Sequence, residues 1–293
     1  MKVATFESKG FQKVGVFIGD HLIDVDLLFE TLARITEREF PEIFSIIDAI
    51  EYWDEVVKSV EKGQKLFKES FFKLFSVRNP ELSVTICRES KVICLGKNYL
   101  EHAKEVGSPP PKEPIIFGKF ADCAIAHGDE IIYPHWVTRL DPEVELAVII
   151  GEGGYNIPKE EAYEHVFGYT IANDVTARNI QTKDIKEALP WYRSKNFDTS
   201  MPIGPWIVTR DEIKNPHNLQ LELSVNGHIR QKGNTKDMIF KIDHLLHFIS
   251  TYTTLYPGDV IITGTVSGIA PIVRGDEIIC KIEGIGELIN KVV

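Results

Sequence analysis

The sequence contains few cysteines, no surplus of basic residues and no long apolar run. Its cysteines, Cys87, Cys94, Cys123 and Cys280, show no Cys-x-x-Cys spacing, so we expect buried free thiols and no zinc site. Acidic residues outnumber basic ones by 43 to 33, giving a net charge of −10, which argues against nucleic acid as a partner. No run approaches the roughly 18–20 apolar residues of a membrane helix, and residues 1–7 lack a signal core. We therefore expect a cytoplasmic protein that does not contact membranes.

The length and composition predict a globular protein with a large core. Of the 293 residues, 43% are hydrophobic. Residues 1–80 contain short strands and a charged helical stretch, and we interpret them as a small N-terminal accessory domain. Residues 81–293 contain many short apolar strands between glycine, proline and asparagine turns. The clearest helices there are predicted at 158–166 and 241–251. Without regular βαβ alternation, the pattern favours an α+β fold with mixed sheets.

Two glutamates stand one residue apart in the predicted strand 140–151. Because side chains alternate along a strand, Glu143 and Glu145 point to one face while the apolar residues between and after them point to the other. Asp174 ends another apolar run. Three enclosed carboxylates need a compensating cation, and an all-oxygen ligand set suits Mg²⁺ or Mn²⁺. The alternative is that the two glutamates lie on the solvent-exposed face of a half-exposed strand, and this segment alone does not exclude it.

Further polar residues have the spacing or surroundings of a catalytic site. His102 and Glu105 are three residues apart and would meet on one face of a helical turn, where the carboxylate could orient the imidazole as a base for water. The alternative is an ordinary surface contact. Lys195 lies in an aromatic-rich string, 190–206, and could donate to a developing oxyanion or simply cover a tryptophan. The turn 263–265 could bring backbone N–H groups near a ligand carboxylate.

Taken together in their order and spacing, these strings resemble the fumarylacetoacetate hydrolase superfamily over residues from about 90 to 293. The strings are Gly96-Lys97-Asn98-Tyr99 with His102 and Glu105, Glu143-x-Glu145-Leu146, Asn173-Asp174-Val175-Thr176-Ala177-Arg178, Lys195-x-Phe197-Asp198, Val225-Asn226-Gly227, Pro257-Gly258-Asp259 and Thr263-Gly264-Thr265. Two positions depart from the family pattern. Asn179 stands where many relatives have aspartate, and Val266 stands where a proline usually follows the threonine turn.

The resemblance implies a mixed β-roll that pairs as a homodimer and binds Mg²⁺ or Mn²⁺. Its implied residue roles are metal ligation by Glu143, Glu145 and Asp174, catalysis by His102, Glu105 and Lys195, and substrate binding by Gln181 and Thr265. The residues 104–112, with three consecutive prolines, are expected to form a lid over the site.

Several reactions are compatible with this set of residues. The first is metal-dependent hydrolysis of a carbon–carbon bond in an acylpyruvate-like 2-oxo acid, with the divalent ion stabilising the enolate that forms. The His102–Glu105 pair favours this reaction because it can activate water. The runner-up is a tautomerase of the 2-hydroxyhepta-2,4-diene-1,7-dioate isomerase type, or a decarboxylase or dehydratase of a 2-oxo acid. A third reading is a metal-dependent binding protein without catalysis.

Overall fold

The computed structural model describes residues 1–293 and has an α+β fold built on three sheets. The largest sheet has 11 strands, with the main order β3-β2-β1-β13-β11-β10-β16-β5-β6, while β4 pairs with β1 and β7 with β13. These strands are β1 (Lys2–Ser8), β2 (Phe11–Ile18), β3 (His21–Asp24), β4 (Glu81–Leu82), β5 (Val92–Gly96), β6 (Ile115–Lys119), β7 (Ala124–Ile125), β10 (Val144–Ile150), β11 (Val166–Asn173), β13 (Met201–Thr209) and β16 (Val260–Thr265).

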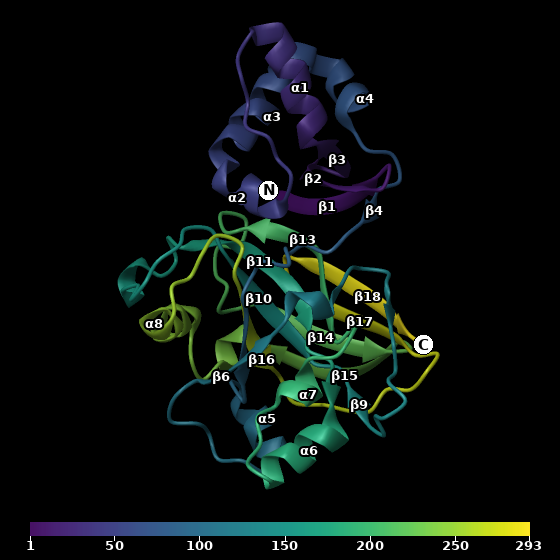
Figure 1. The fold of residues 1–293 in the computed structure, drawn as a ribbon, viewed down its shortest axis with the longest axis vertical. Coiled ribbons are helices and arrows are strands. Elements are labelled where there is room, and N and C mark those ends of the chain that lie inside the picture. Colours follow the sequence, from purple (N-terminus) through teal and green to yellow (C-terminus); the bar gives the residue numbers. More distant parts are fainter.

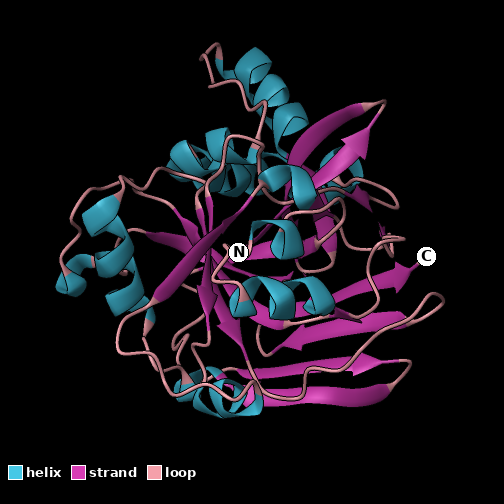
Figure 2. Ribbon diagram, turned by 60° about the horizontal axis from the view of Figure 1, so that its bottom comes forward, coloured by secondary structure: helices cyan, strands magenta, loops and turns pink.

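Two smaller sheets complete the β structure (Figure 2). One has the order β15-β14-β17-β18-β8 and consists of β15 (His228–Asn234), β14 (Gln220–Val225), β17 (Glu277–Ile282), β18 (Gly286–Val292) and β8 (Glu130–Ile131). The other pairs β9 (Leu140–Asp141) with β12 (Thr176–Ala177). Most neighbours are antiparallel, but β16–β5, β13–β7 and β18–β8 are parallel. The predicted α+β class with mixed sheets is confirmed.

The helices are short and lie mostly near the two ends of the molecule (Figure 1). They are α1 (Val25–Thr36), α2 (Ile46–Glu51), α3 (Trp53–Phe67), α4 (Phe71–Phe75), α5 (Leu100–Glu105), α6 (Arg178–Lys186), α7 (Tyr192–Lys195) and α8 (Ile242–Tyr252). None of them combines the length and the apolar character that crossing a bilayer would require.

One predicted helix is wrong. Residues 158–166 form a single 3₁₀ turn, Lys159–Glu161, and the chain is already entering β11 at Val166. Only Ala162 is buried between Pro158 and His165, so this stretch has no apolar stripe to hold a helix against the core. The other predicted helix, 241–251, is confirmed as α8.

Two large clusters of apolar side chains cover the two faces of the central sheet. One contains Val144, Leu146 and Val148 of β10, and it fills the space between this sheet, the five-stranded sheet and α8. The other contains Ala147 and Ile149 from the opposite face of β10, together with side chains of α1, α2 and α3. The N-terminal helices therefore pack on the sheet that positions the candidate site.

The first strand joins the N-terminal residues to this same sheet. β1 pairs with β2 on one side and with β13 on the other, through Lys2 opposite Val208 and Val3 opposite Ile207. In Figure 1 the N-terminal helices lie at one end of the molecule, with β1 next to β13. The division into domains at residue 80 stays a prediction.

Candidate active site

Three carboxylates meet where β10 and β11 run side by side. Glu143 immediately precedes β10, Glu145 is its second residue, and Asp174 directly follows β11. The Asp174 N–H donates to the Glu143 carbonyl at 2.9 Å, and the Glu143 N–H donates to Asn173 Oδ1 at 2.9 Å. These two hydrogen bonds fix the backbones that carry Glu143 and Asp174 relative to each other. One oxygen from each carboxylate lies within 4.8 Å of the others, and all three residues are buried.

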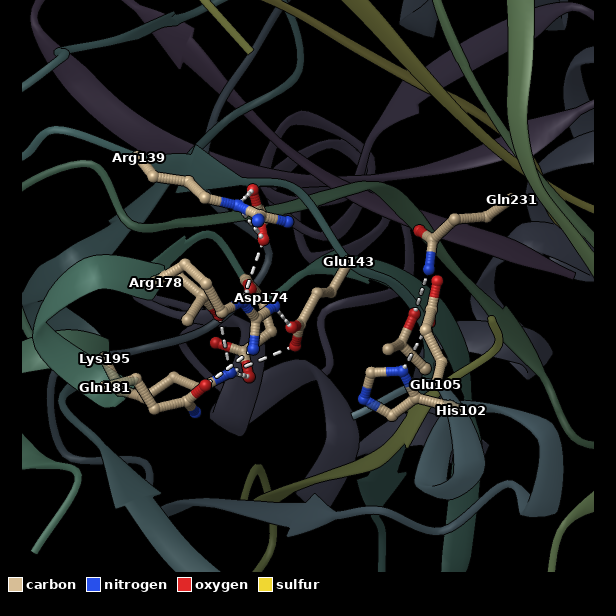
Figure 3. A network of polar contacts seen from close by, with 12 residues as sticks. His102, Glu105, Arg139, Glu143, Asp174, Arg178, Gln181, Lys195 and Gln231 are labelled. Atoms are coloured by element: carbon tan, nitrogen blue, oxygen red, sulfur yellow. Dashed lines mark hydrogen bonds and ion pairs between the residues drawn. The ribbon is translucent and has the colours of Figure 1, made fainter. Parts of the chain in front are cut away.

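Cationic side chains surround two of these carboxylates (Figure 3). Lys195, at the end of α7, donates to Glu143 Oε2 at 3.0 Å, to Asp174 Oδ2 at 2.5 Å and to Thr176 Oγ1 at 2.7 Å. Burial opposes its charge, but Asp174 and Glu143 outweigh burial and raise the pKa of Lys195. Arg178 donates to the other oxygen of Glu143. Burial would raise the pKa of Glu143, but Lys195 and Arg178 hold that pKa below its ordinary value.

Glu145 differs from the other two because no cation contacts it. Its side chain accepts one hydrogen bond, from the Gly264 N–H. The pairing of β10 with β16 shifts register next to Glu145, and Gly264 has a φ of 94°, which suits glycine. Burial raises the pKa of Glu145 well above its ordinary value, and the charges of Asp174 and Glu143 add to that shift.

The donor set fits a hard divalent cation. All three groups are carboxylates, and ligand oxygens that converge within 4.8 Å can share one ion. The uncompensated carboxylate of Glu145 adds a reason, because a cation between the three groups would neutralise the charge that burial and its neighbours disfavour. Mg²⁺ or Mn²⁺ would be held by Glu143, Glu145 and Asp174.

A histidine–glutamate pair on α5 faces the same cavity. His102 Nδ1 lies 3.2 Å from Glu105 Oε2, and Glu105 Oε1 accepts from the Gly268 N–H at 3.0 Å. Since an ionised carboxylate only accepts, Nδ1 carries the proton in the neutral imidazole, which leaves Nε2 as a free base. His102 is buried, whereas the Glu105 side chain is 30% exposed.

A cavity of about 280 Å³ gathers these groups. Of the eight site residues predicted from the sequence, seven line it, and Glu105 stands behind His102. Gln181 on α6 accepts a hydrogen bond from Arg178 Nη1 at 2.6 Å. The Thr265 hydroxyl donates to the Val144 carbonyl at 2.9 Å, so its proton is used within the protein although the residue lines the cavity. Residues 106–109 close one side of the cavity.

The structure adds three polar residues to which sequence reasoning gave no role. Arg178 occurs in the Asp174 string, but nothing in the spacing shows that it bridges Asp141 and Glu143. Lys119 is the last residue of β6 and forms an ion pair with Asp174. Gln231 lies on β15 and contacts both β10 and the end of β16. Lys119 and Gln231 lie outside the motif strings, and only the folded chain brings them to the site.

Comparisons with known proteins identify the family. The model for the fumarylacetoacetate (FAA) hydrolase C-terminal region matches residues 91–293. A human mitochondrial oxaloacetate tautomerase, FAHD2A, is 45% identical over 215 residues, which is 71% of this chain and 68% of the relative.

Two solved structures show the same fold. A 5-carboxymethyl-2-hydroxymuconate delta-isomerase from Mycobacterium smegmatis is 32% identical, with a TM-score of 0.76 over 100% of this chain and 98% of that one. A fumarylpyruvate hydrolase from Pseudomonas aeruginosa, in complex with Mn²⁺ and pyruvate, is 35% identical, with a TM-score of 0.68 over 75% of this chain and 98% of that one. The resemblance drawn from the sequence motifs is therefore confirmed, and the chain belongs to the fumarylacetoacetate hydrolase family.

Proposed function

We propose that the protein is a metal-dependent tautomerase that interconverts the keto and enol forms of a small 2-oxo acid of the oxaloacetate class. The carrying observation is that one cavity of about 280 Å³ holds the carboxylate triad, the buried cation Lys195 and the free Nε2 side of His102. The 45% identity to a relative named as an oxaloacetate tautomerase supports this choice over hydrolysis.

The metal site and the histidine have separate tasks in this proposal. A divalent ion held by Glu143, Glu145 and Asp174 would supply Lewis-acid polarisation of the substrate's 2-oxo group. His102 Nε2 takes the proton from the carbon next to that carbonyl, and the C–H electron pair becomes the C=C bond of the enol. The same proton is then delivered to the former carbonyl oxygen. Glu105 holds the imidazole in the tautomer that can accept it.

Lys195 and Arg178 act through charge and position. The three N–H donors of Lys195 are used by Glu143, Asp174 and Thr176, so its contribution is a fixed positive charge beside the developing oxyanion. Arg178 and Gln181 form the neighbouring wall, where a planar guanidinium and a carboxamide can orient a substrate carboxylate.

The test is the conversion of enol to keto oxaloacetate, followed by ultraviolet absorbance. Metal-stripped protein should be inactive, Mn²⁺ should restore the rate, and Glu143→Gln with Mn²⁺ should stay near the background. A Mn²⁺-loaded wild-type protein that does not accelerate the conversion would remove oxaloacetate tautomerisation from consideration.

Hydrolysis of an acylpyruvate is the second candidate, and the oriented His102–Glu105 pair favours it. The pair could instead deprotonate a water molecule that attacks the remote acyl carbon, and the fumarylpyruvate hydrolase neighbour points the same way. The same preparation is incubated with fumarylpyruvate and acetylpyruvate, and pyruvate release is measured. Pyruvate release without acceleration of oxaloacetate tautomerisation would reverse the order of the two candidates.

A further inference from the structure

We propose that Gln231 is a positioning residue that holds the metal-ligand strand and the histidine–glutamate pair in one frame. It does not reach the cavity and is not a catalytic residue. The inference rests on the proposed function for its kinetic consequence, but its structural consequence can be measured without any substrate.

The carboxamide of Gln231 is fully buried, and three hydrogen bonds connect it to the site. Its Oε1 accepts the Val144 N–H at 2.9 Å. Its Nε2 donates to Thr265 Oγ1 at 2.9 Å and to the Val266 carbonyl at 2.7 Å. Both donors of the amide are used, so its orientation is determined by these contacts. A strand of the five-stranded sheet thereby reaches across to β10 and β16 of the largest sheet.

The first consequence concerns the two glutamates. Val144 is the residue between Glu143 and Glu145, and its N–H goes to Gln231 while its C=O accepts the Thr265 hydroxyl at 2.9 Å. Gln231 therefore contacts one polar backbone group of Val144 directly and the other through the Thr265 hydroxyl. The direction in which the two carboxylates leave the strand is set by the peptide planes on either side of Val144.

The second consequence concerns the base. The segment 265–268, which Gln231 holds at Thr265 and Val266, ends at the Gly268 N–H that donates to Glu105 Oε1 at 3.0 Å. At Gly268 a Cβ atom would lie 2.1 Å from the Arg230 carbonyl oxygen, so the segment is pressed against β15 there as well. β15 thus fixes the segment at both of its ends, and one end orients the His102 partner.

In Figure 3, Gln231 lies above the His102–Glu105 pair, while Lys195, Asp174 and Glu143 form the neighbouring group. Removing a residue that hydrogen-bonds to a metal ligand typically changes metal affinity or activity by about 10–100-fold. Gln231 contacts the backbone of Val144 between the two glutamates, and not the carboxylates themselves. An effect near the lower end of that range is therefore expected.

The experiment compares Gln231→Leu with Asn290→Leu. Asn290 is a buried carboxamide of the same five-stranded sheet that donates to the Ala126 and Asp129 carbonyls at 2.8 and 3.0 Å, outside the site. It is therefore a matched control for the general cost of deleting a buried amide. Three quantities are measured: hydrogen exchange of peptides covering 140–147 and 264–268 in metal-stripped protein, Mn²⁺ affinity by electron paramagnetic resonance, and kcat and KM for oxaloacetate.

We expect Gln231→Leu to speed exchange in both peptides, to weaken Mn²⁺ binding about tenfold and to lower kcat more than it changes KM. Asn290→Leu should lower the melting temperature similarly and leave all three quantities near wild type. If Gln231→Leu does not fold, Gln231→Met, which keeps the length of the side chain, takes its place. Exchange and Mn²⁺ affinity equal to wild type, or equal losses in the control, would overturn the proposal. A wild type that is inactive on oxaloacetate would count against the proposed function only, because exchange and Mn²⁺ affinity still decide the role of Gln231.

Discussion

Lys119 and Asp174 form an ion pair that is closed to solvent, with Nζ 3.0 Å from Oδ1 and side-chain exposures of 0% and 1%. Lys119 also donates to the Lys195 carbonyl and to Ser200 Oγ. Lys119 therefore contacts both the carboxylate of Asp174 and the backbone of Lys195. Asp174 lies between Lys119 and Lys195, each paired with a different oxygen.

Replacing Lys119 by methionine should destabilise the protein strongly. The change leaves the Asp174 carboxylate with one partner fewer and the Lys195 carbonyl without its donor, and breaking a buried pair costs about 3–5 kcal/mol. Urea unfolding of the metal-stripped protein gives the free energy. Arg34→Gln, which removes an exposed pair with Glu30, is the control and should cost about 0.3–0.5 kcal/mol. Equal effects of the two variants would show that burial of the Lys119 pair is unimportant.

Metal binding should release a proton from Glu145. Burial and the two neighbouring carboxylates raise the pKa of Glu145, so the protonated form persists to higher pH than in a free side chain, whereas a metal ligand must be ionised. Mn²⁺ affinity should therefore rise with pH until that raised pKa is passed and fall as the solution is acidified. Calorimetry in buffers of different ionisation enthalpy measures the proton count. Glu145→Gln should abolish the release, and an unchanged count in that variant would assign the proton elsewhere.

Variants of the histidine pair should affect turnover and leave metal binding alone. His102→Asn removes the base and should lower kcat by about 10²–10⁴-fold. Glu105→Gln keeps the shape of its side chain but loses the charge that orients the imidazole, so its loss should be smaller, on the order of tenfold. Neither side chain hydrogen-bonds to the triad, and Mn²⁺ affinity should stay near wild type. A His102→Asn protein with full activity would exclude the imidazole as the base.

The segment after α5 should become protected when the site is filled. Residues 106–109 line the cavity. Lys97, which precedes α5, donates through Nζ to Ser108 Oγ at 2.9 Å, so one hydrogen bond already holds the segment. Oxalate, as an unreactive mimic of a 2-oxo acid, with Mg²⁺ should slow hydrogen exchange over residues 100–115. Peptides of α1 provide the internal control. Unchanged exchange with bound oxalate would argue against closure of this segment.

The carboxylate arrangement could be predicted because strand periodicity is local. Alternation alone places Glu143 and Glu145 on one face, and Val144, Leu146 and Val148 do share the opposite core. The short apolar strands predicted between turn residues include β5, β6 and β16, which the structure forms at 92–96, 115–119 and 260–265. The predicted helix at 158–166 does not form because only Ala162 is buried between Pro158 and His165, and charged helix-forming residues alone do not hold a helix against the core.

Residues that act across sheets gave no local signal. Gln231 is one of two buried residues on a strand that is otherwise exposed or half-exposed, and a polar residue in such a strand is ordinarily interpreted as solvent-facing. Lys119 follows an apolar run and reads as a strand end, because only tertiary structure brings Asp174 beside it. The hydroxyl of Thr265 illustrates the same limit, since the folded chain directs it to the Val144 carbonyl.

The pairing of β1 with β13 covers the backbone edge of β13, which would otherwise be open to pairing with another chain. Val208 and Ile207 are almost inaccessible, and the backbone beside them is paired with Lys2 and Val3. A truncated chain that began at residue 91, where the family match starts, would leave the backbone N–H and C=O groups along this edge of β13 unpaired, next to apolar side chains. Intermolecular strand addition and aggregation should follow, visible as concentration-dependent light scattering. Residues 1–90, which supply β1 and the helices packed on the sheet, would then keep the protein dispersed even though none of them lines the cavity.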